Sequence, residues 1–278
     1  MENFTWNVRG QLLLFTRPLV MGILNHTPDS FFDGGRYADE SQWMAQAEKM
    51  VSEGADILDV GGMSTRPNAA PVSTEEEIKR VVPVVSQLRR WFPDLLISVD
   101  TYRSEVAEAA LEAGASLLND VSGGTEDERI FAVAARYRCP LILMHHQGTM
   151  SDMHQQTEYR DFMADIIDFL ARQTEKARLA GVHDVAVDPG FGFSKTLTQN
   201  YQLLQQMDAL QIIGKPVLAG MSRKSMLYKF LDITPQEALN ATSVVNTFAL
   251  QKGAAILRVH DVREAVECVR IVEQLKQV

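Results

Sequence analysis

Short apolar runs alternate eight times with longer stretches that carry apolar residues at helical spacing. The runs are typical of buried strands, and the stretches between them are typical of amphipathic helices. Strands that alternate with helices are joined by crossovers, so this pattern predicts a parallel sheet. The predicted strands cover residues 19–24, 57–60, 96–99, 116–119, 141–144, 184–187, 216–219 and 255–259.

The intervening stretches have helix start and stop signals. Ser73 precedes three glutamates, which places a capping hydroxyl and favourable charges at a helix N-terminus. Gly54, Gly114 and Gly181 stand where predicted helices end. We predict helices over residues 40–53, 74–91, 103–112, 126–136, 158–180, 197–207, 235–251 and 262–276.

Eight βα units in 278 residues favour a (β/α)8 TIM barrel over a doubly wound sheet. A Rossmann sheet is the second interpretation, but no GxGxxG follows the first strand, and Gly34-Gly35 and Gly61-Gly62 lack that spacing. No linker or charge run marks a boundary. We therefore expect one domain over residues 1–278, with a short N-terminal extension at about 1–17.

Charge excludes some partners. With 27 Lys and Arg against 36 Asp and Glu, the net charge of −9 gives no general attraction to nucleic acid or anionic lipid, so an anionic substrate must be held locally.

The early apolar run Leu12–Phe15 is too short for a signal sequence or membrane span, and a cytoplasmic protein is expected. Cys139 and Cys268 lie in apolar surroundings and are interpreted as buried thiols.

Polar or glycine-rich segments follow each predicted strand. In a barrel these carboxyl ends meet on one face, where active sites are built. Taken singly, Asp59, Asp120 and Asp261 are equally well explained as turn formers or helix caps. Eight such ends together favour a catalytic or ligand site. The segments cover residues 25–30, 59–62, 100–103, 119–120, 145–148, 188–192, 220–224 and 258–261.

The segments Met21–Phe31 and Asp59–Pro67 closely resemble the two signature segments of the dihydropteroate synthase family, a group of pterin-binding barrels. The resemblance continues in order from about Pro18 to the end of the chain. Its further blocks cover residues 98–101, 118–123, 144–148, 188–195, 222–225 and 258–262.

This resemblance implies a cytoplasmic (β/α)8 transferase of folate biosynthesis that is a sulfonamide target. The family joins 6-hydroxymethyl-7,8-dihydropterin diphosphate to para-aminobenzoate, which yields 7,8-dihydropteroate and diphosphate. It uses Mg2+ and usually forms homodimers. The small-molecule substrates require neither nucleic acid nor a membrane.

A dihydropterin presents ring N–H, amino and carbonyl groups along one edge, so its pocket needs acceptors and donors. Taken alone, Met144 and Phe193 are better explained by core packing. Lys224 has a stronger independent case, because two cations follow a strand end in residues 222–225, and a solvated basic turn is the other interpretation. The resemblance assigns pterin binding to Asp100, Asn119, Met144, Asp188, Phe193 and Lys224.

A diphosphate needs positive charge, and the candidates are Arg66, Arg258 and His260. Arg258 and His260 are two residues apart, so on an extended strand they point the same way. Without Arg258 beside it, His260 would be better explained as a core histidine whose hydrogen bonds are satisfied. Asn25 offers an oxygen ligand for a Mg2+ that keeps several waters and binds substrate phosphate.

The resemblance assigns the aminobenzoate site to two mobile loops, at about residues 27–36 and 64–71. Ser222, with the helix start that follows it, would receive the carboxylate. The predicted residues of this site are Phe31, Asp33, Thr65, Pro67, Ser222 and Arg223, together with Arg66.

The chain has no GxSxG nucleophile, so we expect electrostatic stabilisation of the leaving diphosphate rather than a covalent intermediate. Two alternatives stay open. One is a methyltetrahydrofolate-dependent corrinoid methyltransferase of the same barrel group, and the other is a non-catalytic pterin-binding barrel. The Thr-Pro-Asp-Ser-Phe loop at residues 27–31 and the Arg-Val-His set at residues 258–260 argue against the methyltransferase. A mere pterin binder needs no diphosphate site, so the non-catalytic barrel is disfavoured by the presence together of Asn25, Arg66, Lys224, Arg258 and His260.

Overall fold

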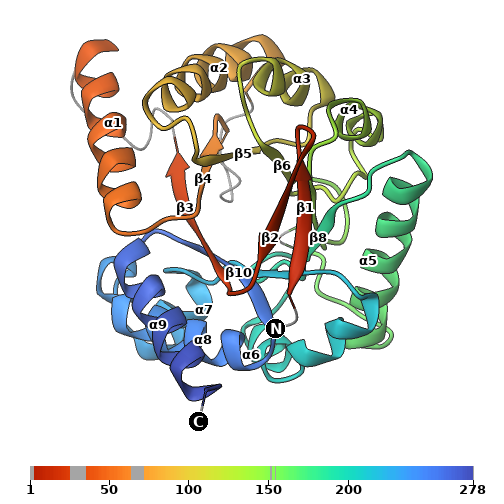
Figure 1. Ribbon diagram of the computed structural model, residues 1–278. Coiled ribbons are helices and arrows are strands. Elements are labelled where there is room, and N and C mark those ends of the chain that lie inside the picture. The colour runs from red at the N-terminus through yellow and green to blue at the C-terminus, as the bar shows by residue number, and fades with distance from the viewer. Residues whose placement is uncertain (1–2, 26–35, 64–71, 151, 154, 278) are drawn as a thin grey trace.

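The computed structural model describes residues 3–25, 36–63, 72–150, 152–153 and 155–277, without the side chains of residues 25 and 36–40. Eight parallel strands form a closed barrel in the order β10-β3-β4-β5-β6-β7-β8-β9 (Figure 1). The strands are β3 (Leu19–Asn25), β4 (Ile57–Gly61), β5 (Leu96–Asp100), β6 (Leu117–Asp120), β7 (Leu141–Met144), β8 (Val185–Asp188), β9 (Val217–Ala219) and β10 (Ala254–Val259).

The predicted barrel is confirmed, and each predicted strand boundary lies within one residue of the observed one. The Rossmann alternative is wrong, because β10 pairs with β3 and closes the sheet. In this pairing Arg258 is the register partner of Met21. An open doubly wound sheet ends in two edge strands, whereas every strand of this barrel has a neighbour on both sides.

Helices surround the barrel, as Figure 1 shows. They are α1 (Arg36–Ser52), α2 (Thr74–Trp91), α3 (Ser104–Glu112), α4 (Arg129–Tyr137), α5 (Phe162–Leu179), α6 (Leu197–Gln205), α7 (Ser225–Leu231), α8 (Leu239–Gln251) and α9 (Val262–Leu275). The Ser73 hydroxyl accepts a hydrogen bond from the Glu76 amide at 3.2 Å, so α2 begins with the predicted cap. The predicted helix at 235–251 is divided into a 3-10 turn, η3 (Pro235–Glu237), and α8.

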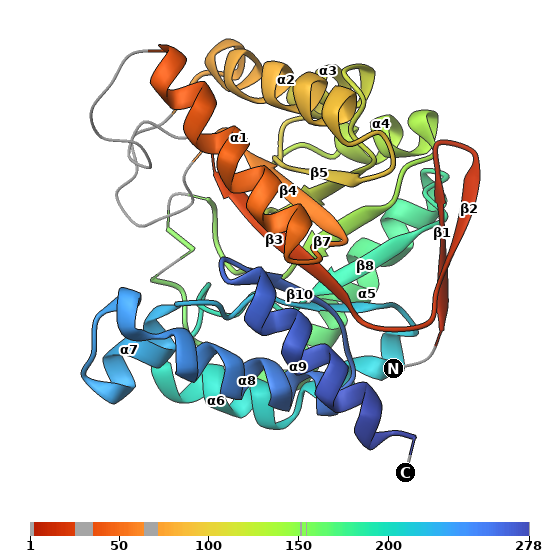
Figure 2. The same cartoon turned by 60° about the vertical axis from the view of Figure 1, so that its left-hand side comes forward.

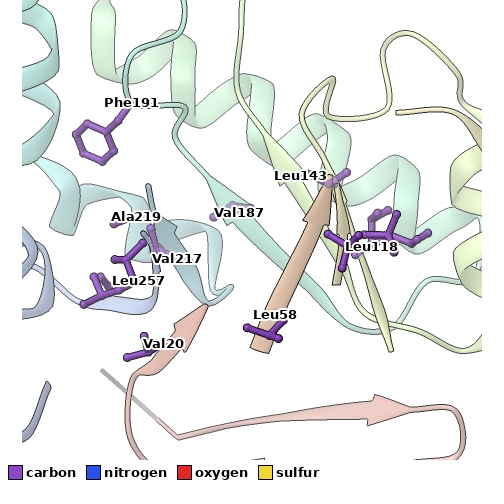
Figure 3. Packing of buried hydrophobic residues seen from close by; sticks show 14 of the residues in the cluster. Val20, Leu58, Leu118, Leu143, Val187, Phe191, Val217, Ala219 and Leu257 are labelled. Carbon is purple, nitrogen blue, oxygen red and sulfur yellow. The ribbon is translucent and has the colours of Figure 1, made fainter. Parts of the chain in front are cut away.

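The core has two apolar layers that follow the alternation of side chains along the strands. On β3, Val20 and Leu24 pack between the barrel and its helices, whereas Leu19 and Met21 lie among residues of the barrel interior. Figure 3 shows Val20 in the outer layer with residues of several other strands. This two-sided burial explains why the strands read as continuous apolar runs.

The N-terminal extension is an ordered hairpin of β1 (Phe4–Val8) and β2 (Gln11–Phe15), for which the sequence analysis predicted no structure. It crosses one end of the barrel (Figures 1 and 2). Trp6 is fully buried among residues at the amino ends of the strands, and it contacts the rings of Phe4 and Phe15 edge-on. The hairpin thus closes the amino end and leaves the polar carboxyl end available.

Both cysteines are free and buried, as predicted. Burial raises the pKa of the Cys139 thiol to about 12, which makes it unreactive at neutral pH. Within the described parts of the chain, every helix is too short or too polar to cross a membrane.

Candidate active site

The register of the barrel places the polar strand ends side by side. Asp100 at the end of β5 is the partner of Asn119 on β6, and Met144 at the end of β7 is the partner of Asp188 on β8. These four residues therefore lie at the same end of neighbouring strand pairs, where the sequence predicts the site.

Arg258 connects this edge across the mouth of the barrel. Its Nε atom donates to Asp59 Oδ2 at 2.6 Å and its Nη2 atom donates to Asp100 Oδ2 at 2.7 Å. The Asn119 amide donates to the same Asp59 oxygen at 3.1 Å. Four strands, β10, β4, β5 and β6, thus contribute one residue each to what we call the mouth cluster: Arg258, Asp59, Asp100 and Asn119.

The mouth cluster confines charge in a weakly solvated place. Asp59 is completely buried, and its Oδ1 atom has no partner among the described residues. Burial raises the pKa of Asp100, and the charge of Arg258 opposes that shift. Burial also acts to lower the pKa of Arg258, but Asp59 and Asp100 outweigh it and raise that pKa. The guanidinium therefore remains charged and holds both carboxylates.

A second acid and cation pair lies beside the mouth cluster. Asp188 Oδ1 accepts a hydrogen bond from the Gly190 amide at 2.7 Å. Burial raises the pKa of Asp188 and lowers that of Lys224 to about 8, while each charge opposes the shift of the other. The Lys224 ammonium donates to the Phe191 carbonyl and lies 4.7 Å from the centre of the Phe193 ring. This pair offers an acceptor, a donor and an aromatic face together.

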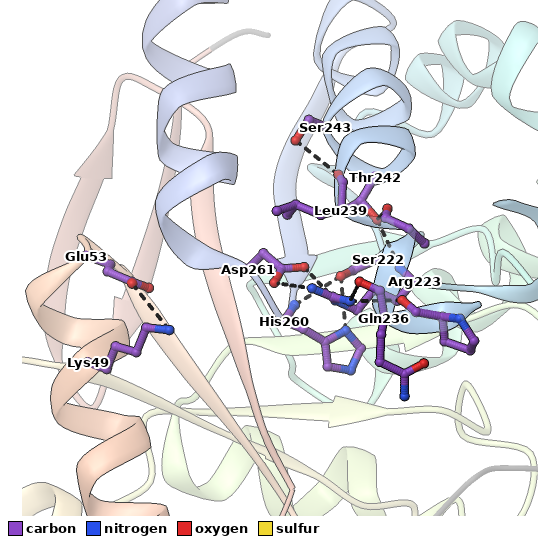
Figure 4. A network of polar contacts seen from close by, with 12 residues as sticks. Lys49, Glu53, Ser222, Arg223, Gln236, Leu239, Thr242, Ser243, His260 and Asp261 are labelled. Carbon is purple, nitrogen blue, oxygen red and sulfur yellow. Dashed lines mark hydrogen bonds and ion pairs between the residues drawn. The ribbon is translucent and has the colours of Figure 1, made fainter. Parts of the chain in front are cut away.

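Ser222 and His260 form a neighbouring polar group, shown in Figure 4. The Ser222 hydroxyl oxygen lies 3.0 Å from His260 Nδ1 and accepts a hydrogen bond from the His260 amide at 3.1 Å. His260 is exposed, so the interpretation as a satisfied core histidine is wrong.

Arg223 stabilises the loop that carries Ser222. Its guanidinium forms two hydrogen bonds of 2.8 Å with Asp261, and its Nη1 atom donates to the carbonyls of Pro235 and Gln236. Asp261 thus holds an arginine rather than capping α9 by its side chain. These contacts occupy most of the donors of Arg223, so they favour a supporting role for this residue over direct contact with a substrate.

Some predicted residues cannot be placed. Phe31, Asp33, Thr65, Arg66 and Pro67 lie outside the described residues. Asn25 ends β3 opposite Gly61, but its side chain is not described. Among the described residues there is no group of three or more His, Cys, Asp or Glu side chains able to hold a metal.

The sequence allowed Asp59, Asp120 and Asp261 to be either site residues or turn formers and helix caps, and the structure differs among them. Asp120 accepts hydrogen bonds from Ser122 and Gly124 and forms a turn, as the structural interpretation proposed. Asp59, in contrast, is central to the mouth cluster. Its position inside an otherwise apolar strand was the available signal, because a buried carboxylate needs a cation.

His145 and Lys195 are not among the predicted site residues, yet they form a buried contact beside the site. The Lys195 ammonium nitrogen lies 3.1 Å from His145 Nδ1, and both residues are buried. The available signals were the place of His145 in the polar segment 145–148 and that of Lys195 at the end of the resemblance block 188–195.

A closed (β/α)8 barrel whose carboxyl mouth gathers acids, an amide and cations is typical of an enzyme that binds a small polar ligand. The family model described as pterin binding enzyme matches residues 21–260, and the chain belongs to this family. Within it, the chain belongs to the dihydropteroate synthases, which are transferases of folate biosynthesis.

The similarity to these synthases extends over nearly the full chain. The dihydropteroate synthase of Streptococcus pyogenes serotype M3 is 43% identical over 96% of this chain and 98% of its own length. That of Escherichia coli is 42% identical over 95% and 94%. The structure of the Yersinia pestis enzyme with a sulfonamide drug complex has a TM-score of 0.92 and 42% identity, and it covers 99% of this chain and 100% of its own.

We predict that Asp59→Asn lowers the free energy of unfolding by about 3 kcal/mol, because it leaves part of the charge of Arg258 unpaired in a buried place. Urea unfolding monitored by circular dichroism measures this. Glu105→Gln, at the exposed ion pair with Arg129, is the matched control and should change stability by less than about 1 kcal/mol. Equal effects of the two variants would contradict the prediction.

Proposed function

We propose that this chain is a single-domain dihydropteroate synthase that joins 6-hydroxymethyl-7,8-dihydropterin diphosphate to para-aminobenzoate. The observation that carries this proposal is the mouth cluster with Asp188 and Lys224 beside it. Ligands in the structures of relatives support it: 4-aminobenzoic acid with the Xanthomonas albilineans enzyme and pteroic acid with the Clostridium difficile enzyme.

The pterin binds across the mouth. Asp188 and Asp100 accept hydrogen bonds from the amino and ring N–H groups, and Asn119 can both donate and accept. Lys224 donates to the carbonyl and N5 side of the ring, while Phe193 covers one face. Met144 is buried at the end of β7 and would contact the ring as part of the pocket wall.

Arg258, His260 and Arg66 bind the diphosphate. The Nη1 atom of Arg258 donates to no described residue, so it can take a phosphate oxygen while Nε and Nη2 keep their carboxylates. The bond between the pterin methylene carbon and the diphosphate oxygen breaks, and its electron pair leaves with diphosphate. The aminobenzoate nitrogen then bonds to the methylene carbon and releases a proton. The fixed cations stabilise the leaving charge.

Mg2+ is part of the proposal. The Asn25 amide oxygen would hold it, in keeping with a hard cation that retains several waters and shares phosphate oxygens. When bound, it would neutralise charge on the diphosphate. Asn25 ends β3 and is the register partner of Gly61 at the end of β4, so it lies at the carboxyl mouth where the diphosphate would bind.

The aminobenzoate site remains a proposal from family resemblance. Its loop residues would be Phe31, Asp33, Thr65 and Pro67, with Ser222 receiving the carboxylate. The Ser222 hydroxyl oxygen contacts both the ring and the amide of His260, which fixes its position at the end of the loop. Arg223 would contribute by stabilising the Ser222 loop through Asp261.

We also propose a homodimer in which a second copy of this chain covers the face formed by α6, α7 and α8. This face has an apolar groove of about 550 Å³. Its walls include three strongly exposed apolar side chains: Phe230 (62%), Val244 (47%) and Phe248 (53%). Large apolar side chains that together form one exposed patch are unusual in a monomer. A self-complementary apolar face is what a two-fold symmetric pair would bury.

Phe248→Glu should convert the dimer into a monomer, because it places a charge in the apolar interface. Sedimentation velocity at micromolar concentration measures the mass. Ile271→Glu, at an exposed apolar residue of α9 outside the groove, should leave the dimer intact. A monomeric wild-type protein would refute the proposed dimer.

The activity is tested with purified protein, the pterin diphosphate, Mg2+ and para-aminobenzoate, by following both diphosphate and dihydropteroate. We expect both products, and their loss with a chelator. Arg258→Ala should lower kcat by about 10²-fold or more, because a preorganised cation is removed, whereas Arg263→Ala on the exposed face of α9 should not.

Other outcomes separate the alternatives. Methyl transfer to a corrinoid protein would identify the methyltransferase, and pterin binding without either product would identify a non-catalytic barrel. Unchanged diphosphate release by Arg258→Ala would remove the proposed role of this arginine.

The pH profile should report Lys224. As the pH rises through about 8, its ammonium loses a proton and can no longer serve as the charged donor to the pterin, so kcat/KM for the pterin diphosphate should fall. Lys224→Arg stays charged and should lose the part of the fall centred near pH 8, although its kcat/KM is lower throughout. Initial rates from about pH 7 to about pH 10 measure this. The same alkaline fall in Lys224→Arg would contradict the assignment, and Lys229→Arg serves as the control.

A further inference from the structure

Lys195 is a buried cation outside the substrate contacts described above, and its amine nitrogen has three partners. It lies 3.1 Å from His145 Nδ1, 3.1 Å from the Gly190 carbonyl oxygen and 3.0 Å from the Phe193 carbonyl oxygen. An ammonium group has three N–H donors, so these three acceptors would satisfy it completely. The group joins the segment after β7 to the segment after β8.

The two carbonyls belong to a turn with an unusual backbone. Gly190, Gly192 and Ser194 have φ values of 73°, 81° and 53°. A Cβ atom at Gly190 would lie 2.1 Å from the His145 carbonyl oxygen, so this close approach requires glycine. The turn encloses Lys195 and carries Phe193, while the Gly190 amide donates to Asp188. Its shape therefore determines where two proposed pterin contacts lie.

Other contacts join the same two segments. The Ser194 hydroxyl donates to the Met153 carbonyl and accepts from the Gln147 amide at 2.8 Å. The Tyr159 hydroxyl donates to the Ser194 carbonyl, and its ring stacks on the His145 ring at 6.0 Å. The Tyr159 ring and the Lys195 amine nitrogen thus both hold the His145 ring.

We propose that Lys195 is a positioning residue for the pterin site, which donates all three ammonium hydrogens to Gly190, Phe193 and a neutral His145 protonated only at Nε2. It acts through the turn, by fixing the orientation of Asp188 and Phe193, and it contacts no substrate. This inference rests on the proposed function for its kinetic consequence, but its structural part is independent of activity.

The electrostatic surroundings are compatible with this arrangement. Burial lowers the pKa of His145 well below its usual value, and the neighbouring charge of Lys195 lowers it further, so the imidazole is neutral. Burial lowers the pKa of Lys195 to about 7, against the opposing carboxylate of Asp188. An uncharged amine would have only two donors for three partners, and His145 would then have to donate from Nδ1.

The direct test is the tautomer of His145. Long-range 1H–15N correlation spectra of the 15N-histidine-labelled enzyme, without substrates at about pH 6, should show Nδ1 unprotonated. The His145 signals are identified by their absence from His145→Asn. An imidazole protonated at Nδ1, or one that titrates like a free histidine, would overturn the proposal whether or not the chain has the proposed activity.

Kinetics test the positioning role. Lys195→Met should raise KM for the pterin diphosphate about tenfold or more and leave KM for para-aminobenzoate within about threefold, since misplaced contacts weaken only the pterin. Lys176→Met, at an exposed ion pair on α5, is the control. Equal increases in both KM values, or no increase in either, would contradict the role.

A second pair of variants keeps the test usable if Lys195→Met does not fold. His145→Asn places an amide oxygen near the Nδ1 position, so it should preserve the wild-type KM for the pterin within about threefold. His145→Leu removes the acceptor and should behave like Lys195→Met. Identical KM values for the two His145 variants would overturn the proposal. Absence of product with the wild type would instead refute the proposed function, while the tautomer would still decide the role of Lys195.

Discussion

The charged contacts at the carboxyl end of the barrel are the constraint on which the rest of the site depends. A parallel barrel brings strand ends from distant parts of the chain together, and here it places Asp59 and Asp100 where water has little access. Two carboxylates in such a place repel each other unless a cation lies between them. Arg258 supplies that cation from β10, so the strand that closes the barrel also places a positive charge between the two acids.

Such a cluster is a poor way to gain stability, because the desolvation of three charges offsets much of their attraction and apolar side chains would often serve equally well. Its presence is better explained by function. A rigid set of donors and acceptors can recognise a flat heterocycle without rearranging. The same logic applies to Asp188 and Lys224. The negative net charge of the chain makes these local cations the means by which it attracts a diphosphate.

The barrel could be predicted because each strand is buried on both faces and bounded by turn residues, a pattern that local sequence carries. The hairpin of β1 and β2 was missed, since its exposed Leu12 and Leu14 obscure the alternation and Trp6 is buried only by strands elsewhere in the chain. The helix α7 was not predicted, because its seven residues are too few to show a clear helical period. Asp100, Asn119 and Arg258 could be placed at one site from strand ends and family resemblance. The role of Asp59 depends on a contact with β10, and the contact of Lys195 with His145 depends on the shape of the turn after β8. Residue patterns encode neither.

The central claim is that Asp59 serves ligand binding by holding Arg258 in place. Isothermal titration of the pterin diphosphate into Asp59→Asn, Arg258→Gln and the double variant, without aminobenzoate, measures their coupling in the binding free energy. The account predicts that the double variant binds no worse than the weaker single variant, which is a coupling of about 1 kcal/mol or more. Losses that simply add, within about 0.5 kcal/mol, would show that the two residues act separately and would contradict the account.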